Sequence, residues 1–239
     1  MAPSVPQSRF TSRVGGGSVF LVRPMKVPDE YEPVQLIALL RSQGPQLRTH
    51  YFRPQSDLSY LIKCSVRGNT FRAFAHLALK PSEIFREWTH RYFTNKRIAD
   101  LSTITRQPQY DQFLEAAVVD LTQAWSKRSG QQLKFGASRK LTNLLFKSLI
   151  RFVAIPDSAR QVLIPLLHVP HDRFCFATIR RSANSGQFGA SLRIPKNASM
   201  GFITSAPQYD AIQELMRRIS TAADEPAITV DLVAWDSTH

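Results

Sequence analysis

The sequence is poor in cysteine and contains no long apolar run. Its two cysteines, Cys64 and Cys175, are too few for a disulfide framework or for a four-cysteine metal or iron–sulfur site. No apolar stretch approaches the roughly 18–20 residues that span a bilayer, and residues 1–18 lack the apolar core of a signal peptide. We therefore expect an intracellular, cytoplasmic protein with no membrane partner, and a flexible basic tail over residues 1–18.

The sequence also lacks the motifs of nucleotide cofactors and of serine hydrolases. It contains no Walker loop, no dinucleotide fingerprint and no catalytic serine elbow. His168, His171 and Cys175 share a helical spacing, but their surroundings are apolar and no matching fourth ligand is evident. We therefore expect neither a cofactor nor a bound metal, and we take a monomer as the default state.

The composition favours a packed globule. Hydrophobic residues make up 43% of the chain, which includes 15 phenylalanines, and such a chain can bury a core. The 239 residues suffice for one large domain or two small ones. We expect residues 19–239 to form a single helical globule, with a possible division into lobes over 19–106 and 107–239.

The positive charge is concentrated in the middle of the chain. The net charge is +13, and residues 61–160 carry 17 Lys and Arg against 7 Asp and Glu. Residues 161–239 are balanced, with 7 of each sign. A localised basic excess favours a polyanionic partner, nucleic acid first and an anionic membrane second. A basic protein without such a partner is the alternative.

Hydrophobic periodicity and end signals predict a mainly helical fold with a small β component. Proline near the first turn and glycine after the last mark a helix over 108–130, and Pro81 suits the start of a helix over 81–93. Further helices are predicted over 31–42, 137–153, 156–167 and 207–224, with another following Asp172 within 170–182.

Short apolar runs supply the predicted β component. Residues 19–23 and 227–235 favour strands, and 58–66 with 70–79 favour a hairpin around a turn-like Arg67-Gly68-Asn69. The second arm of that hairpin is equally compatible with a helix, because periodicity cannot separate the two structures in so short a run.

The helix predicted over 137–153 combines an apolar stripe with a polar one. Lys140, Asn143, Lys147 and Arg151 recur at helical spacing, and Gly136 directly precedes the helix. A polar stripe is ordinarily a solvated face. Here the glycine adds exposed backbone N–H groups and a helix N-terminus beside the cations, a combination that suits a phosphate.

The segment GASRKLTN over 136–143 resembles the second half of the helix-hairpin-helix of base-excision DNA glycosylases, whose pattern is roughly G-x-G-[R/T]-K-x-A-[N/D]. In that superfamily the hairpin backbone grips a DNA phosphate, and in bifunctional members the lysine attacks the sugar C1′. Lys140 matches that lysine. The essential aspartate of the family opens the next helix, and Asp172 in LLHVPHDRFCF has a comparable place.

The chain departs from the family pattern in three respects. Ser138 replaces the second glycine, and His171 precedes the aspartate instead of following it. Lys140 and Asp172 are 32 positions apart, which is longer than the usual spacing in the family. The resemblance covers about 40 of the 239 residues.

The resemblance implies a helix-hairpin-helix glycosylase fold and a DNA N-glycosylase that removes a damaged or modified base from double-stranded DNA, in repair or in antiviral defence. Asp172 would stabilise positive charge on the sugar, and Lys140 would be either the nucleophile or a phosphate anchor. A neutral amine would be favoured by burial and by neighbouring Arg139. The implied DNA contacts are Gly136, Ser138, Arg139, Asn143, Lys147, Arg151, Arg180 and Arg181.

A base flipped out of the duplex requires an aromatic-lined pocket. The candidates are Phe174, Trp125, Trp235, Tyr209 and His171, although large aromatic side chains are more commonly core residues. Arg180 and Arg181 suit the end of a helix equally well. The alternative to an enzyme is a non-catalytic nucleic-acid-binding protein on a related helical scaffold, and a further one is an RNA- or membrane-associated basic protein.

Overall fold

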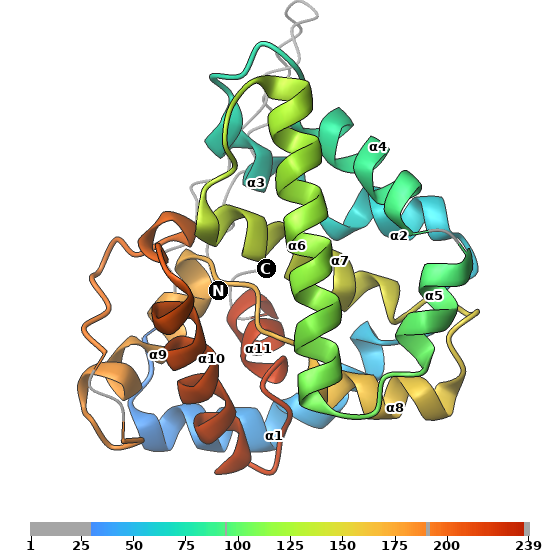
Figure 1. Cartoon of the computed structure of the whole chain (residues 1–239). Helices are drawn as coiled ribbons and strands as arrows, with labels where there is room; N and C mark the ends of the chain where they lie inside the picture. Colours follow the sequence, from blue (N-terminus) through green and yellow to red (C-terminus); the bar gives the residue numbers. More distant parts are fainter. Residues whose placement is uncertain (1–29, 94, 190–191, 237–239) are drawn as a thin grey trace, which may run out of the picture.

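The structure, a computed structural model, describes residues 30–93, 95–189 and 192–236, and helices are the main regular structure in these ranges (Figure 1). They contain 11 α-helices and two short 3-10 helices. Their one β pairing is an isolated bridge between Gln55 and Phe152. The prediction of a mainly helical fold is therefore confirmed, and the predicted β component is wrong for the described part of the chain.

The helices follow one another with short connections. In chain order they are α1 (Pro33–Tyr51), α2 (Leu58–Ser65), α3 (Gly68–Phe71), η1 (Arg72–Phe74), α4 (Pro81–Tyr92), α5 (Asn95–Ser102), α6 (Gln107–Ser129), α7 (Phe135–Leu149), α8 (Asp157–Leu166), α9 (Arg173–Asn184), η2 (Met200–Phe202), α10 (Ala206–Thr221) and α11 (Thr229–Asp236). The long α6 runs beside the other helices for much of the height of the molecule (Figure 1).

Strong end signals placed the best-predicted helices. Helix α6 carries proline in its first turn and ends at Gly130, which adopts the left-handed conformation with φ of 69° that glycine tolerates. Helix α4 begins at Pro81, where the missing N–H of proline costs nothing. Helix α1 extends nine residues beyond the predicted 31–42, continuing through Pro45 to Tyr51.

The predicted hairpin is absent: its first arm forms α2, and its second arm is helical up to Phe74 and continues as turns and bends over 75–79. Asp57 caps α2 by accepting a hydrogen bond from the backbone N–H of Tyr60 at 2.9 Å, which starts a helix instead of a strand. Leu61, Ile62 and Ser65 then point inward at helical spacing. The expected turn at Arg67-Gly68-Asn69 is the beginning of α3.

The predicted strand over 227–235 forms α11. Residues 227–234 are all buried, so the run has no exposed face and carries no periodicity that separates helix from strand. The strand predicted over 19–23 and the tail predicted over 1–18 lie outside the described residues.

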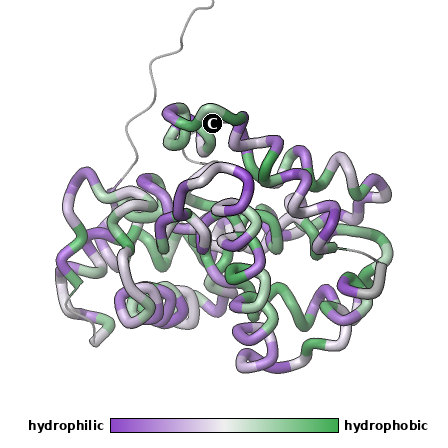
Figure 2. Tube along the Cα trace, turned by 45° about the horizontal axis from the view of Figure 1, so that its top comes forward, coloured by the Kyte–Doolittle hydropathy of each residue, from purple (hydrophilic) through white to green (hydrophobic). Residues whose placement is uncertain are grey.

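Buried apolar side chains form two core clusters. The first core cluster comes mainly from α2 to α8, and the second comes from α1, α9, α10, α11 and the segment around η2. The chain passes from the first to the second between Leu167 and Val169, so the clusters do not follow the predicted lobe boundary at 106–107. Each helix carries both hydrophobic and hydrophilic residues (Figure 2).

Helix α7 lies along the seam between these clusters. Its apolar stripe, which includes Leu141 and Leu145, belongs to the first core cluster. Residues 136–149 of α7 are buried, so its polar stripe is also covered by protein. The groups that pair with this polar stripe come mostly from the C-terminal helices, as described next.

Candidate active site

Lys140 of α7 and Asp172 at the start of α9 meet at the seam. Their Nζ and Oδ2 atoms are 3.5 Å apart, although the two residues are 32 positions apart in the sequence. Both side chains are almost fully buried, with 9% and 6% of their surfaces exposed. The structure therefore brings together the two side chains that the sequence predicted to be catalytic.

The Asp172 carboxylate is held through one of its two oxygens. Oδ1 accepts hydrogen bonds from the backbone N–H groups of Phe174 at 2.9 Å and Cys175 at 3.0 Å, so Asp172 caps α9. Oδ2 is buried and has no hydrogen-bond partner among the described residues. This oxygen faces Nζ of Lys140 at 3.5 Å, so the ion pair is its one polar contact among the described residues, whereas buried polar atoms are normally hydrogen-bonded.

The N-terminus of α7 is covered by the chain itself. A Cβ at Gly136 would collide with the backbone carbonyl oxygens of Met200 and Ile203, the latter at 2.8 Å. The group that lies next to Gly136 in this structure is therefore the backbone of the η2 segment, at the position where the sequence predicted a phosphate. Gly136 and Ser138, expected to contact a DNA phosphate, are both buried.

The polar stripe of α7 is paired internally instead of facing solvent. Asn143 donates to the hydroxyl of Tyr209 at 2.9 Å, and Lys147 forms an ion pair with Asp231 of α11. The guanidinium carbon of Arg151 lies 4.9 Å from the ring centroid of Tyr51. The expected exposed face is absent because its partners come from α1, α10 and α11, far away in the sequence.

The other predicted phosphate-binding arginines also have protein partners. Arg139 forms an ion pair with Glu115 and lies over the rings of Phe135 and Tyr209, at 5.1 and 5.2 Å from their centroids. Ion pairs also join the end of α9 to the residues before α1. Arg180 pairs with Glu30, and Arg181 pairs with both Glu30 and Glu32. Arg181 is the one exposed residue of the predicted DNA contacts, and Arg151 is half-buried.

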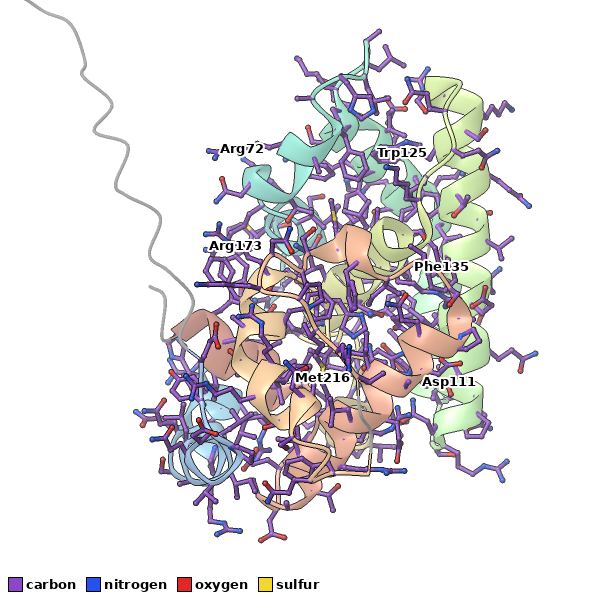
Figure 3. The ribbon with its side chains drawn as sticks, turned by 90° about the vertical axis from the view of Figure 1, so that its left-hand side faces the viewer. Arg72, Asp111, Trp125, Phe135, Arg173 and Met216 are labelled. Carbon is purple, nitrogen blue, oxygen red and sulfur yellow. The ribbon has the colours of Figure 1, made fainter. Side chains whose placement is uncertain are left out.

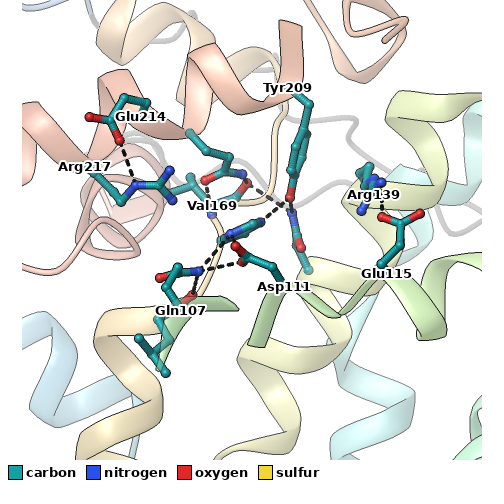
Figure 4. Close-up of polar contacts among 12 residues, drawn as sticks. Gln107, Asp111, Glu115, Arg139, Val169, Tyr209, Glu214 and Arg217 are labelled. Atoms are coloured by element: carbon teal, nitrogen blue, oxygen red, sulfur yellow. Dashed lines mark hydrogen bonds and ion pairs between the residues drawn. The ribbon is translucent and has the colours of Figure 1, made fainter. Parts of the chain in front are cut away.

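A polar network includes the hydroxyl of Tyr209 (Figure 4). This hydroxyl is 2.8 Å from Nδ1 of His168, and Nε2 of His168 is 3.0 Å from Oδ1 of Asp111. Since Asn143 donates to the hydroxyl, Tyr209 can donate to Nδ1 and leave the proton on Nε2 facing Asp111. Gln107 also donates to Asp111, at 2.8 Å. No pattern in the sequence predicted this network, because its members are spread over α6, α10 and the segment before α9.

Burial controls the titration of this region. Burial, and to a smaller extent the neighbouring His168 and Lys140, lowers the pKa of His171 to about 3, so the His171 imidazole is neutral. Burial also raises the pKa of Tyr209, against the opposing hydrogen bond from Asn143. Burial works to raise the pKa of Asp111, but hydrogen bonds from His168 and Gln107 outweigh it and lower that pKa.

The predicted base-pocket aromatics separate into half-buried and buried groups. Phe174 and Trp235 are half-buried and pack together, with ring centroids 4.9 Å apart. Tyr209 and His171 are buried, with ring centroids 5.1 Å apart. Trp125 is a core residue, 4.9 Å from the ring of Phe74.

Two arginines that were not predicted from the sequence flank the half-buried pair of Phe174 and Trp235. The guanidinium carbon of Arg173 lies 4.7 Å from the ring centroid of Phe174, and that of Arg67 lies 6.0 Å from the ring centroid of Trp235. Neither arginine forms an ion pair with any described residue. Arg72 projects from the same side of the molecule as Arg173 (Figure 3). The position of Arg173 directly after Asp172 was the available sequence signal.

The described residues contain neither a metal-binding cluster nor a membrane-spanning helix. In these ranges no group of three or more His, Cys, Asp and Glu side chains could hold a metal ion. No helix within the same ranges has the length and apolar composition needed to cross a membrane. Comparisons with protein-family models, with curated proteins and with solved structures give no match to this chain.

Proposed function

We propose that this protein is a DNA N-glycosylase of the helix-hairpin-helix type, which removes a damaged or modified base. The observation that carries the proposal is the buried Lys140–Asp172 pair at the start of α9, in which Oδ2 of Asp172 faces the ammonium group of Lys140 and accepts no hydrogen bond from the described residues. The resemblance of GASRKLTN to the glycosylase hairpin supports the same function. Substrate identity and biological setting, whether repair or antiviral defence, stay open within this proposal.

The pair suits the chemistry of N-glycosidic cleavage. Breaking this bond develops positive charge on the sugar, as in glycoside hydrolysis, and a carboxylate beneath the ring stabilises that charge. The α9 backbone fixes Oδ1 of Asp172, so Oδ2 is the oxygen that faces the sugar or activates a water. No chemical work is assigned to Oδ1, because its lone pairs are engaged at the helix cap.

Lys140 has two possible roles in this proposal. As a nucleophile it would lose a proton to the Asp172 carboxylate at 3.5 Å and attack the sugar C1′. The new C–N bond would form as the bond from C1′ to the base breaks, and the base would leave with that proton. As a charged ammonium it would instead anchor a phosphate and balance the carboxylate. The first role makes the enzyme bifunctional and the second makes it monofunctional.

The DNA would approach the side that carries Arg67, Arg173, Phe174 and Trp235. Cations at a phosphate backbone provide sequence-independent affinity, and aromatic rings stack on an unpaired base. The two arginines have no acidic partner among the described residues, in contrast to the arginines at the end of α9. This surface replaces the α7 stripe, which is buried, as the proposed DNA-binding face.

The test is base release from defined DNA. Purified protein is incubated with duplexes that carry a broad panel of damaged and modified bases, including hypermodified viral bases, and released bases are identified by mass spectrometry. Alkali then cleaves the strand at each abasic site. The proposal predicts a free base and an abasic site with at least one duplex, and its absence across the panel contradicts enzyme function.

A non-catalytic nucleic-acid-binding protein is the second candidate. The coverage of Gly136 by the η2 backbone and the burial of most of the predicted phosphate contacts favour it, because they leave the hairpin without an open phosphate site. This candidate predicts tight, salt-dependent DNA binding without base release. Competition among duplex DNA, RNA and anionic vesicles separates it from an RNA- or membrane-associated protein.

A further inference from the structure

A second buried ion pair lies two turns along α7 from Lys140. Lys147 pairs with Oδ2 of Asp231 on α11, and both residues are buried, Asp231 completely. A buried ion pair contributes little net stability, because the loss of hydration offsets the attraction, so stability alone does not explain it. The proposed chemistry, which uses Lys140 and Asp172, gives these two residues no direct part.

Cys175 connects this pair to Asp172. Its backbone N–H donates to Oδ1 of Asp172 at 3.0 Å, and its thiol donates to Oδ1 of Asp231 at 3.3 Å. Burial, together with the two nearby carboxylates, raises the pKa of the Cys175 thiol, which therefore stays protonated and remains a donor. One residue thus fixes an oxygen of each carboxylate.

The charges around Asp231 are balanced by Lys147. Burial raises the pKa of Asp231, Lys147 opposes this, and the negative charge of Asp172 adds to the rise. Burial likewise disfavours the charged form of Lys147, but Asp231 outweighs it and raises the pKa of Lys147, with a smaller contribution from Tyr51 of α1. Since like charges disfavour each other's ionisation, an unpaired Asp231 would disfavour the ionised form of Asp172.

We infer that Lys147 and Asp231 are a positioning pair for Asp172. Asp231 holds the first turn of α9 in place through the Cys175 thiol, and Lys147 balances the negative charge that Asp231 places near Asp172. The catalytic meaning of this inference rests on the proposed glycosylase function, in which Asp172 acts on the sugar. The inferred coupling between the two carboxylates can be tested whether or not the protein is an enzyme.

The inference predicts effects of opposite sign for the two partners. Lys147→Met leaves a carboxylate without its cation, so Asp172 should take up its proton at a higher pH than in the wild type. Asp231→Asn leaves Lys147 without its anion, so Asp172 should be protonated only at a lower pH. The double variant Lys147→Met/Asp231→Asn removes both charges and should restore the titration midpoint. Each single shift should be on the order of one pH unit.

The measurement is a pH titration of the Asp172 carboxyl by ¹³C NMR in protein labelled at aspartate, with Asp172→Asn used to assign the resonance. If Lys147→Met does not fold, Asp231→Asn and the double variant still decide the outcome. A lower midpoint in Asp231→Asn that the double variant restores supports the inference. A midpoint that is unchanged in the single variants, or that moves in the same direction in both, overturns it.

The titration is independent of base release, so the two proposals fail separately. If an active protein is found, the acid limb of its pH–rate profile should move with the same signs, whereas a merely structural role lowers the rate in both single variants without this sign pattern. If no base is released but the midpoints shift as predicted, the glycosylase proposal fails while the coupling of the two pairs stands.

Discussion

The backbone carbonyl of Met200 lies against Gly136 so closely that α7 has no room for a Cβ at this position. Gly136 is therefore required by the packing of η2 on the first turn of α7. The space beside Gly136, where the sequence predicted a phosphate, is filled in this structure by the backbone of the η2 segment. Any phosphate at this end of α7 would require the η2 segment to move away.

Gly136→Ala should destabilise the protein by about 1–3 kcal/mol, as overpacking does, although alanine is ordinarily the better helix former. Chemical denaturation measures the change in the free energy of unfolding. Gly201→Ala is the matched control in η2, because nothing lies within 4 Å of a Cβ built there. Equal stability of the Gly136→Ala protein and the wild type would contradict the tight packing of η2 on α7.

His171 should make the protein sensitive to acid. Its pKa falls from 6.5 to about 3 in the folded protein, so the unfolded chain takes up the proton first as the pH drops. The stability contributed by the neutral imidazole is therefore present above pH 6.5 and is lost as the pH falls toward 3. The expected slope is up to about 1.4 kcal/mol per pH unit in this window.

Urea denaturation of the wild type and of His171→Gln at several pH values measures this slope. The variant keeps a hydrogen-bonding group near Gln213, 3.3 Å from the imidazole, but has no proton to bind. We expect the stability of the wild type to depend more steeply on pH than that of the variant. Parallel curves for the two proteins would show that His171 does not titrate in this way.

Charge reversal at Arg67 and Arg173 should weaken DNA binding to all sequences alike. Each lost phosphate contact should reduce the slope of log affinity against log salt by about one, since such contacts carry no sequence information. Binding can be followed by the fluorescence of Trp235. Trp88 and Trp125 are each only 1% exposed, so a base that stacks on the protein should quench the half-buried indole of Trp235.

Arg128→Glu is the control for this experiment, because Arg128 is equally cationic but is already paired with Glu87. An unchanged salt slope in both Arg67→Glu and Arg173→Glu would place the DNA on another face. Loss of quenching in Trp235→Phe, with binding retained in a gel-shift assay, would confirm that the signal comes from Trp235.

Lys140→Ala should separate the two proposed roles of this lysine. If Lys140 is the nucleophile, borohydride trapping of a covalent protein–DNA adduct and base release are both lost. If it is a phosphate anchor, or an amine that only cleaves the strand, base release is retained while any trapped adduct disappears. Lys140→Arg keeps the positive charge and is the control, since it can anchor a phosphate but cannot form a Schiff base.

The sequence predicted helices well where their ends were marked. Pro81, Gly130 and the acidic cap at Asp172 each act through neighbouring backbone groups, which a local pattern contains. Residues 227–235 were predicted wrongly because burial on all sides erases the periodicity. The hairpin prediction failed because Asp57 caps a helix, a local signal that the analysis did not use.

The site was partly predictable for the same reason. Lys140 and Asp172 were identified by a resemblance of local motifs, and their contact at 3.5 Å was not implied by their spacing. The burial of Asn143 and Lys147 was missed because their partners, Tyr209 and Asp231, lie far along the chain. A polar stripe that meets other buried polar groups looks, in sequence, the same as a solvated one.

The most direct measurement of the central claim is base release by Asp172→Asn. Asparagine caps a helix about as well as aspartate, so the variant should fold, but it lacks the charge that faces the sugar cation. We predict that base release is abolished while DNA affinity is retained or raised, since one repulsion with phosphate is removed. A folded Asp172→Asn protein that releases the base at the wild-type rate would contradict the assignment of Asp172 as the catalytic carboxylate.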